Sequence, residues 1–194
     1  MVLWPKAARR EASDELIEAA RSALLVVDVQ QNLAPAMHEA EACLESCHLL
    51  VEAARRLDIP VLATEQYPKG LGPTVPELAA LLPRERTFAK QRFSCAADPK
   101  IRAALTALGR FQVMICGIEA HVSVLQSALG LKALGLRPVV VADAIASRLP
   151  QARELALARL RAHGVEIVNA EMVVFEWLRE AGTPDFKALI PLIK

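Results

Sequence analysis

The sequence predicts one α/β domain built on a parallel sheet that helices cover on both faces. Short apolar runs alternate six times with segments whose apolar residues recur at helical spacing, and the connections are short. The first run, residues 23–29, is apolar on both sides of the chain, which is typical of a strand buried on both faces. Right-handed crossovers between parallel strands place the intervening helices over both faces.

The first half of the chain gives three strands and three helices. Strands are expected at residues 23–29, 60–64 and 86–90, because each is a short apolar or β-favouring run. A helix is expected over residues 39–57, where Cys43, Cys47, Leu50 and Ala54 share one face. Residues 65–74 are rich in turn formers and predict a loop, followed by short helices at 75–82 and 99–108.

The second half continues the same alternation. Strands are expected at residues 111–116, 137–142 and 165–168, and a helix begins near Val122, where Leu125 and Leu129 continue its apolar face. Further helices are expected at 151–163, at 171–181 and around 186–190. Residues 1–20 are a polar lead-in of some helical character, so we assign one domain to residues 21–194.

Composition narrows the class of protein. The chain has 194 residues, 54% of them hydrophobic, and a net charge of +1, which argues against a nucleic acid or a membrane as partner. No apolar run approaches the length of a membrane span, and residues 1–10 do not resemble a signal peptide. The four cysteines form no disulfide framework; Cys43 and Cys47 are expected to be core thiols. These features predict a cytoplasmic protein.

Several polar groups follow the expected strands and are predicted to meet at one edge of the sheet. In such sheets, ligands bind beyond the carboxyl ends of the strands, near the point where strand order reverses. The candidates are Asp28, Glu65, Lys90, the turn 117–123 with Ser123, and Asp143. Lys90 would be the counter-ion of Asp28, which could act as a general base, and Asp143 is expected to be a cap or turn former.

Other site types find little support. No glycine-rich turn follows the first strand, and no histidine spacing suits zinc, so neither a nucleotide cofactor nor a metal is expected. His121 precedes Ser123 by two residues, and at that separation their side chains diverge. Cys116 ends a buried strand, whereas Cys95, in the loop after Lys90, is a second candidate for a nucleophile.

The motifs resemble those of the isochorismatase-like hydrolases, also called the cysteine hydrolase superfamily, and most closely its isochorismatase-domain-containing branch. The matching segments are residues 24–30 (LLVVDVQ), 64–78 (TEQYPKGLGPTVPEL), 88–94 (FAKQRFS), 117–126 (GIEAHVSVLQ), 141–144 (VADA) and 175–184 (FEWLREAGTP). The resemblance implies a three-layer α/β/α fold with a six-stranded parallel sheet, Rossmann-like in outline. It also implies a homo-oligomer, a dimer or larger.

The resemblance also implies site roles. The family's catalytic aspartate and lysine correspond to Asp28 and Lys90, and its nucleophilic cysteine corresponds to Ser123. A non-proline cis peptide before the nucleophile turn would fall at Ile118–Glu119, and the backbone of this turn, Val122 included, would hold an oxyanion. Zinc-binding members use an aspartate and histidines after the second strand; residues 65–67 are Glu-Gln-Tyr, so no metal is expected.

The serine leaves three functions open. The first is an amidase-type hydrolase with Asp28 as proton acceptor, Lys90 as its orienting partner and Ser123 as a slower nucleophile than a thiol. The second is hydrolysis of a vinyl ether, as in isochorismate, with Asp28 as general acid. The third is an impaired site kept for binding or assembly. In each case the partner is a small molecule, and Gln30, Tyr67 and Phe93 are expected to line its pocket.

Overall fold

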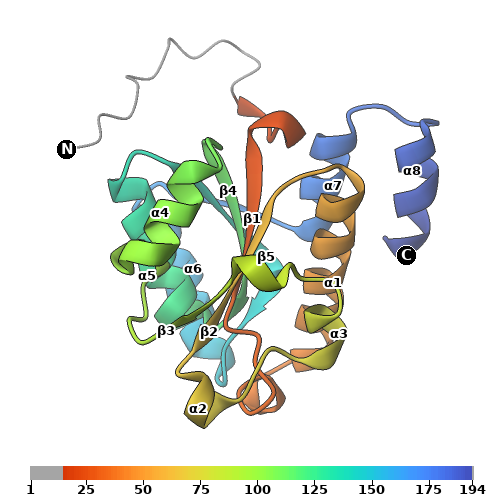
Figure 1. The fold of residues 1–194 in the computed structure, drawn as a ribbon. Coiled ribbons are helices and arrows are strands. Elements are labelled where there is room, and N and C mark those ends of the chain that lie inside the picture. The colour runs from red at the N-terminus through yellow and green to blue at the C-terminus, as the bar shows by residue number, and fades with distance from the viewer. Residues whose placement is uncertain (1–14, 194) are drawn as a thin grey trace.

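The computed structural model describes residues 15–193, in which six parallel strands form one sheet in the order β3-β2-β1-β4-β5-β6 (Figure 1). The strands are β1 (Ser22–Val27), β2 (Val61–Gln66), β3 (Thr87–Lys90), β4 (Gln112–Ile118), β5 (Arg137–Ala146) and β6 (Glu166–Val168). Strand order reverses between β1 and β4. The predicted α/β class and the six-stranded parallel sheet are therefore confirmed.

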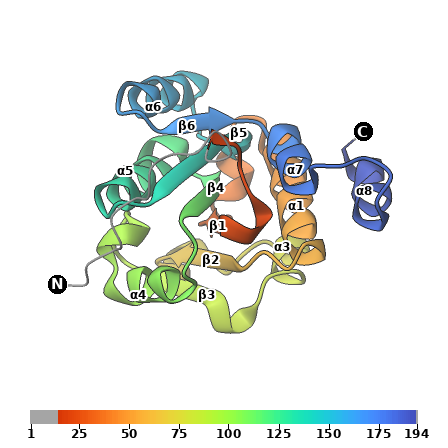
Figure 2. The ribbon, with the colours of Figure 1, turned by 90° about the horizontal axis from the view of Figure 1, so that it is seen from above.

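Helices cover both faces of the sheet, as Figure 2 shows from above. The helices α4 (Pro99–Ala107), α5 (Leu125–Ala133) and α6 (Pro150–Ala162) lie over one face. On the other face lie α1 (Ala40–Arg56) and α7 (Ala170–Leu178), with the short α3 (Pro76–Ala79) near α1 and α8 (Pro184–Leu189) outside α7. Within residues 15–193, no helix is long and apolar enough to cross a membrane.

Alternate residues of each central strand supply the two apolar layers. In β1, Leu24 and Val26 pack toward α1, whereas Leu25 and Val27 pack toward the face that α4 and α5 cover. Because a strand points successive side chains to opposite faces, a strand that is apolar throughout fits only a sheet covered on both sides. The uninterrupted apolar run thus has a direct structural cause.

Three local features differ from the expectation. Strand β5 continues to Ala146, because the pairing of β4 with β5 shifts register between Ile115 and Gly117 and then resumes. Asp143 therefore lies inside β5 rather than after it. The loop at 65–74 contains a short helix, α2 (Pro68–Leu71), and a single π-type turn, Ala120–Val124, precedes α5.

The N-terminal lead-in is described only from residue 15. Residues 1–14 lie outside the described part of the chain, so its helical character there stays a prediction. Ile17 is fully buried in the core that α1 and α7 share, and the Glu18 N–H donates to Gln112 Oε1 at 2.8 Å. The described part of the lead-in therefore packs on the domain.

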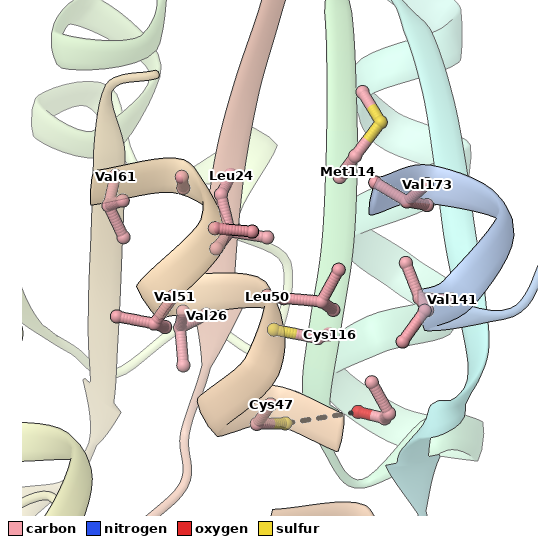
Figure 3. Packing of buried hydrophobic residues seen from close by; sticks show 14 of the residues in the cluster. Leu24, Val26, Cys47, Leu50, Val51, Val61, Met114, Cys116, Val141 and Val173 are labelled. Atoms are coloured by element: carbon pink, nitrogen blue, oxygen red, sulfur yellow. Dashed lines mark hydrogen bonds between the residues drawn. The ribbon is translucent and has the colours of Figure 1, made fainter. Parts of the chain in front are cut away.

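Three buried thiols lie where α1 packs on the sheet: Cys43 and Cys47 belong to α1 and Cys116 to β4, and Figure 3 shows Cys47 and Cys116. The Cys47 thiol donates a hydrogen bond to the Ala144 carbonyl at 3.3 Å. A hydrogen bond with Cys47 and then burial raise the pKa of Cys43, and a hydrogen bond with Cys116 is the largest cause that raises the pKa of Cys47. Cys43, Cys47 and Cys116 are thus core thiols, as the sequence predicted.

Candidate active site

The candidate site lies at the carboxyl ends of β1 and β4, where strand order reverses. Asp28 directly follows β1 in the left-handed region, with φ of 53°, a conformation that aspartate tolerates better than most residues. Its N–H donates to the Thr64 carbonyl at 3.0 Å. Gly117 pairs with Val27 across the two strands, and a Cβ at Gly117 would lie 2.0 Å from the Val27 carbonyl oxygen.

Asp28 and Lys90 form a buried ion pair at this edge. Lys90 Nζ lies 2.7 Å from Asp28 Oδ2, and the two residues are only 2% and 1% exposed. The lysine is the last residue of β3, so its side chain extends past β2 to reach the end of β1. Burying either charge alone would be costly, and the pairing explains how an apolar core tolerates both.

Lys90 also brings Ser123 into the same cluster. The ammonium donates to Asp28 Oδ2 and Gln66 Oε1, both at 2.7 Å, and lies 3.2 Å from the Phe93 carbonyl and 3.3 Å from Ser123 Oγ. A lysine has three N–H groups for these four acceptors, so the two longer contacts compete. Among the described residues, only Lys90 forms a hydrogen bond with the Ser123 hydroxyl. Ser123 as a whole is 3% exposed.

Two members of the cluster, Thr64 and Gln66, escaped the sequence analysis. Thr64 Oγ1 donates to Asp28 Oδ1 at 2.7 Å, and Gln66 accepts from Lys90. Both belong to β2, two residues apart, and therefore share one side of the strand. That spacing at the end of an apolar strand was the available signal. Thr64, Gln66, Asp28, Lys90 and Ser123 are hereafter the reactive cluster.

The turn before Ser123 is held by contacts with the loop after β5. The peptide between Ile118 and Glu119 is cis, as the resemblance implies. Glu119 Oε2 accepts from the Arg148 backbone N–H at 3.1 Å and from its Nε at 3.0 Å. The Val122 N–H donates to the Glu119 carbonyl at 3.1 Å, so in this conformation it is engaged within the turn.

The three residues expected to line the pocket differ in exposure. Tyr67 and Phe93 are 49% and 50% exposed, and they follow β2 and β3 at the edge of the reactive cluster. Gln30 is fully buried: its amide donates to the Gln66 and Gly72 carbonyls and accepts from the Gln66 N–H. Gln30 therefore holds the loop after β2 in place and does not line an open surface.

The remaining candidates at this edge lie outside the reactive cluster. Glu65 turns to Thr74, accepting from its N–H and hydroxyl, and Asp143 accepts from the Ala170 N–H at 2.9 Å. Asp143 thus caps α7, which confirms its predicted role as a cap. His121 Nδ1 lies 2.9 Å from Ser147 Oγ rather than near Ser123.

Cys95 is the thiol nearest to the reactive cluster. Its Sγ lies 3.9 Å from Thr64 Oγ1, and its side chain is fully buried. Burial raises the pKa of the Cys95 thiol, which opposes formation of the nucleophilic thiolate. Among residues 15–193, no group of three or more His, Cys, Asp or Glu residues is arranged to hold a metal ion.

Known proteins of similar sequence and structure share this fold. The chain is 37% identical over 174 residues to the mouse isochorismatase domain-containing protein 2A, covering 89% of this chain and 82% of the mouse protein. The MAR1 ribonuclease of Caenorhabditis elegans is 35% identical with a TM-score of 0.86, over 92% of each chain. YcaC of Pseudomonas aeruginosa, solved with hexane-2,5-diol and covalent acrylamide, is 26% identical with a TM-score of 0.87, over 92% of this chain and 91% of that one.

YcaC of Escherichia coli, an octameric hydrolase of unknown specificity, is 23% identical with a TM-score of 0.83 over 95% and 97% of the two chains, which shows a shared fold. The family model for the isochorismatase domain matches residues 22–172, from the start of β1 into α7. This match spans every strand and every member of the reactive cluster. The chain therefore belongs to the isochorismatase family.

Proposed function

We propose that this protein hydrolyses the C–N bond of a small amide, with Asp28, Lys90 and Ser123 as its catalytic residues. The observation that carries the proposal is the position of Lys90 Nζ, 2.7 Å from the Asp28 carboxylate and 3.3 Å from the Ser123 hydroxyl oxygen. A nucleophile beside a buried ion pair at the switch point of a parallel sheet is suited to covalent catalysis. Membership of a hydrolase family supports the same reaction class.

The contacts suggest a division of roles. Ser123 Oγ would attack the amide carbonyl carbon and pass its proton to Asp28, while Lys90 stabilises the negative charge that develops on Oγ. Breaking the C–N bond then returns that proton to the leaving nitrogen, so ammonia or an amine departs. Water hydrolyses the resulting ester and restores the Ser123 hydroxyl. Backbone N–H groups of the turn at Ile118, Glu119 and Val122 are proposed to hold the oxyanion; Val122 must first release Glu119.

Hydrogen bonding favours this role over vinyl-ether hydrolysis. Thr64 donates to Oδ1 of Asp28 and Lys90 donates to Oδ2, so both carboxylate oxygens act as acceptors. An ionised carboxylate has this acceptor-only character, whereas a general acid would need a proton to give. The half-exposed rings of Tyr67 and Phe93 supply apolar walls for a small substrate.

The first experiment measures ammonia release from a panel of small primary amides. Ser123→Cys should increase kcat/KM, because a thiol loses its proton far more readily than a hydroxyl. Adding Asp28→Asn to that variant should abolish the gain. Ser94→Cys is a matched control, because Ser94 bonds the Gln126 carbonyl and lies outside the reactive cluster. If neither the natural chain nor Ser123→Cys releases ammonia, the amidase proposal is wrong and a binding role gains support.

We also propose that the chain acts as a homo-oligomer in the cytoplasm, without a cofactor. The octameric E. coli YcaC, which shares the fold, supports the first part of this proposal. Sedimentation velocity of the full chain would test it: a single species of monomer mass at micromolar concentration would contradict the proposal.

A further inference from the structure

A second cavity lies at the opposite end of the sheet from the reactive cluster. It is an open depression of about 660 Å³ at the N-terminal ends of β2 and β3, bordered by the end of α1 and the end of α4. Strand β2 runs from Val61 in this cavity to Gln66 in the reactive cluster, so the two sites are roughly 17 Å apart along the strand. No step of the proposed reaction uses this surface.

The charges around the cavity are unbalanced. Arg55, Arg86 and Arg110 line it together with a single carboxylate, that of Asp58. Arg55 has a counter-ion in Glu52 at 3.6 Å, but Arg86 and Arg110 form no ion pair with any residue that the structure describes. Arg110 is also partly buried, which makes an uncompensated guanidinium less favourable than it would be in open water. The cavity therefore presents a positive field that an anion would neutralise.

The rest of the lining is mostly apolar. Ile59, Leu82 and Val61 are almost fully buried beneath the cavity, and Leu81, Pro83 and Leu108 are partly exposed around it. Guanidinium groups bind the oxygens of phosphate in a two-pronged geometry, and the apolar wall favours a carbon skeleton attached to that head group. A ligand with both parts would use the cations and the apolar surface together.

We propose that this cavity binds a small organic anion with a dianionic head group, such as a phosphate monoester, through Arg86 and Arg110. The proposal is independent of the reaction at Ser123, because the residues involved lie at the other end of the strands.

Isothermal titration calorimetry of the full chain with phenyl phosphate tests the proposal. Saturable binding of one ligand per chain is expected, with phenol, benzoate and inorganic phosphate each at least tenfold weaker. Phenol is uncharged, benzoate has a single negative charge, and inorganic phosphate has no apolar ring. Arg86→Gln and Arg110→Gln should each weaken binding of phenyl phosphate about tenfold. Arg86 is exposed and Arg110 is partly exposed, so both variants are expected to fold. Thermal melts would verify this.

Two controls locate the binding. Arg84→Gln removes an exposed arginine two residues from Arg86 that does not line the cavity, and it should change the dissociation constant less than twofold. Ser123→Ala should also leave it unchanged. The proposal is overturned if the natural chain shows no saturable binding, if Arg84→Gln weakens binding as much as Arg86→Gln does, or if Ser123→Ala abolishes it. Equal affinity for benzoate or inorganic phosphate would contradict the proposed ligand class.

Discussion

The thiols of Cys43, Cys47 and Cys116, hereafter the thiol cluster, and the hydroxyl of Ser123 belong to residues that are all buried, yet their surroundings differ completely. Cys43, Cys47 and Cys116 contact apolar side chains, one another and a backbone carbonyl (Figure 3). Ser123 instead lies 3.3 Å from a buried ammonium that is paired with a carboxylate. Thiols are intrinsically better nucleophiles than hydroxyls, so the type of atom alone would place the chemistry at the cysteines.

The surroundings reverse that ranking. In the thiol cluster, hydrogen bonding and burial raise the pKa of Cys43 and Cys47, and no ammonium among the described residues is in contact to favour a thiolate. In the reactive cluster, the Lys90 ammonium donates hydrogen bonds to oxygen atoms, and Ser123 Oγ is one of them. Negative charge that develops on Ser123 Oγ would therefore be stabilised. Opposite charges gather at the ends of the strands in this protein, and the proposed chemistry depends on them.

The largest effect is expected when the Lys90 ammonium, which distinguishes the two regions, is removed. Lys90→Met should lower the free energy of unfolding by about 3–5 kcal/mol, because it leaves the buried Asp28 charge without a partner. Urea denaturation measures the loss. The double variant with Asp28→Asn should recover part of it, since no unpaired charge then remains. A loss below about 1 kcal/mol for Lys90→Met would mean that the pair is far less buried in solution.

A smaller loss is expected at Thr64. Thr64→Val keeps the shape of the side chain but removes the hydrogen bond to Asp28 Oδ1, which should cost about 1–3 kcal/mol and lower amide turnover. Thr106→Val is the matched control, because its hydroxyl bonds only the Arg102 carbonyl on the solvent-facing side of α4. Equal melting temperatures for the two variants would show that Thr64 does not support the Asp28 carboxylate.

The thiol cluster should affect stability alone. Cys116→Ala leaves a small gap beside Cys47 and should cost about 1 kcal/mol, within the usual range for a conservative core change. Ammonia release by the Ser123→Cys form should remain within twofold when Cys116→Ala is added. A tenfold loss of kcat/KM at unchanged melting temperature would instead link the thiol cluster to catalysis.

The smallest effect is expected from thiol reagents at pH 8. Burial raises the pKa of Cys95, so at pH 8 its thiol should stay protonated and react with iodoacetamide far more slowly than in the unfolded chain. The raised pKa favours the folded state fully below the ordinary thiol pKa of about 8.5, and this contribution is lost as pH rises beyond it. Mass spectrometry would locate the label. Rapid single-site labelling of Cys95 with loss of turnover would reinstate it as a nucleophile.

The fold could be predicted from sequence because the central strands β1 and β4 contain continuous apolar runs, and a doubly covered sheet accommodates that pattern. The end of β5 could not be predicted, because its extension to Ala146 depends on a register shift against β4 that no local sequence pattern encodes. Asp28, Lys90 and Ser123 were found by asking which polar groups follow strands. Thr64 and Gln66 were missed because they lie within β2, where a polar residue is easily taken for part of the strand.

Gln30 shows the opposite error, because it was expected to line the pocket and does not. Its position after β1 suggested contact with a ligand, but its amide is used entirely by backbone groups of the loop after β2. The direction of a side chain in a turn depends on long-range partners, here residues 66 and 72. Sequence spacing therefore predicted the edge of the sheet at which these polar side chains gather, but not which of them are tied to backbone groups.

Gly117 carries no functional group, yet it affects the distance between the Asp28 carboxylate and the Ser123 hydroxyl. A methyl group there would collide with the Val27 carbonyl, at 2.0 Å, and force β1 away from β4. Asp28 is one residue beyond Val27, and Ser123 follows the turn after Gly117. Separating β1 from β4 would therefore shift both side chains. An alanine scan that counts lost contacts would overlook this position. The close approach of β1 and β4 at the site therefore depends on a residue that has no side chain to lose.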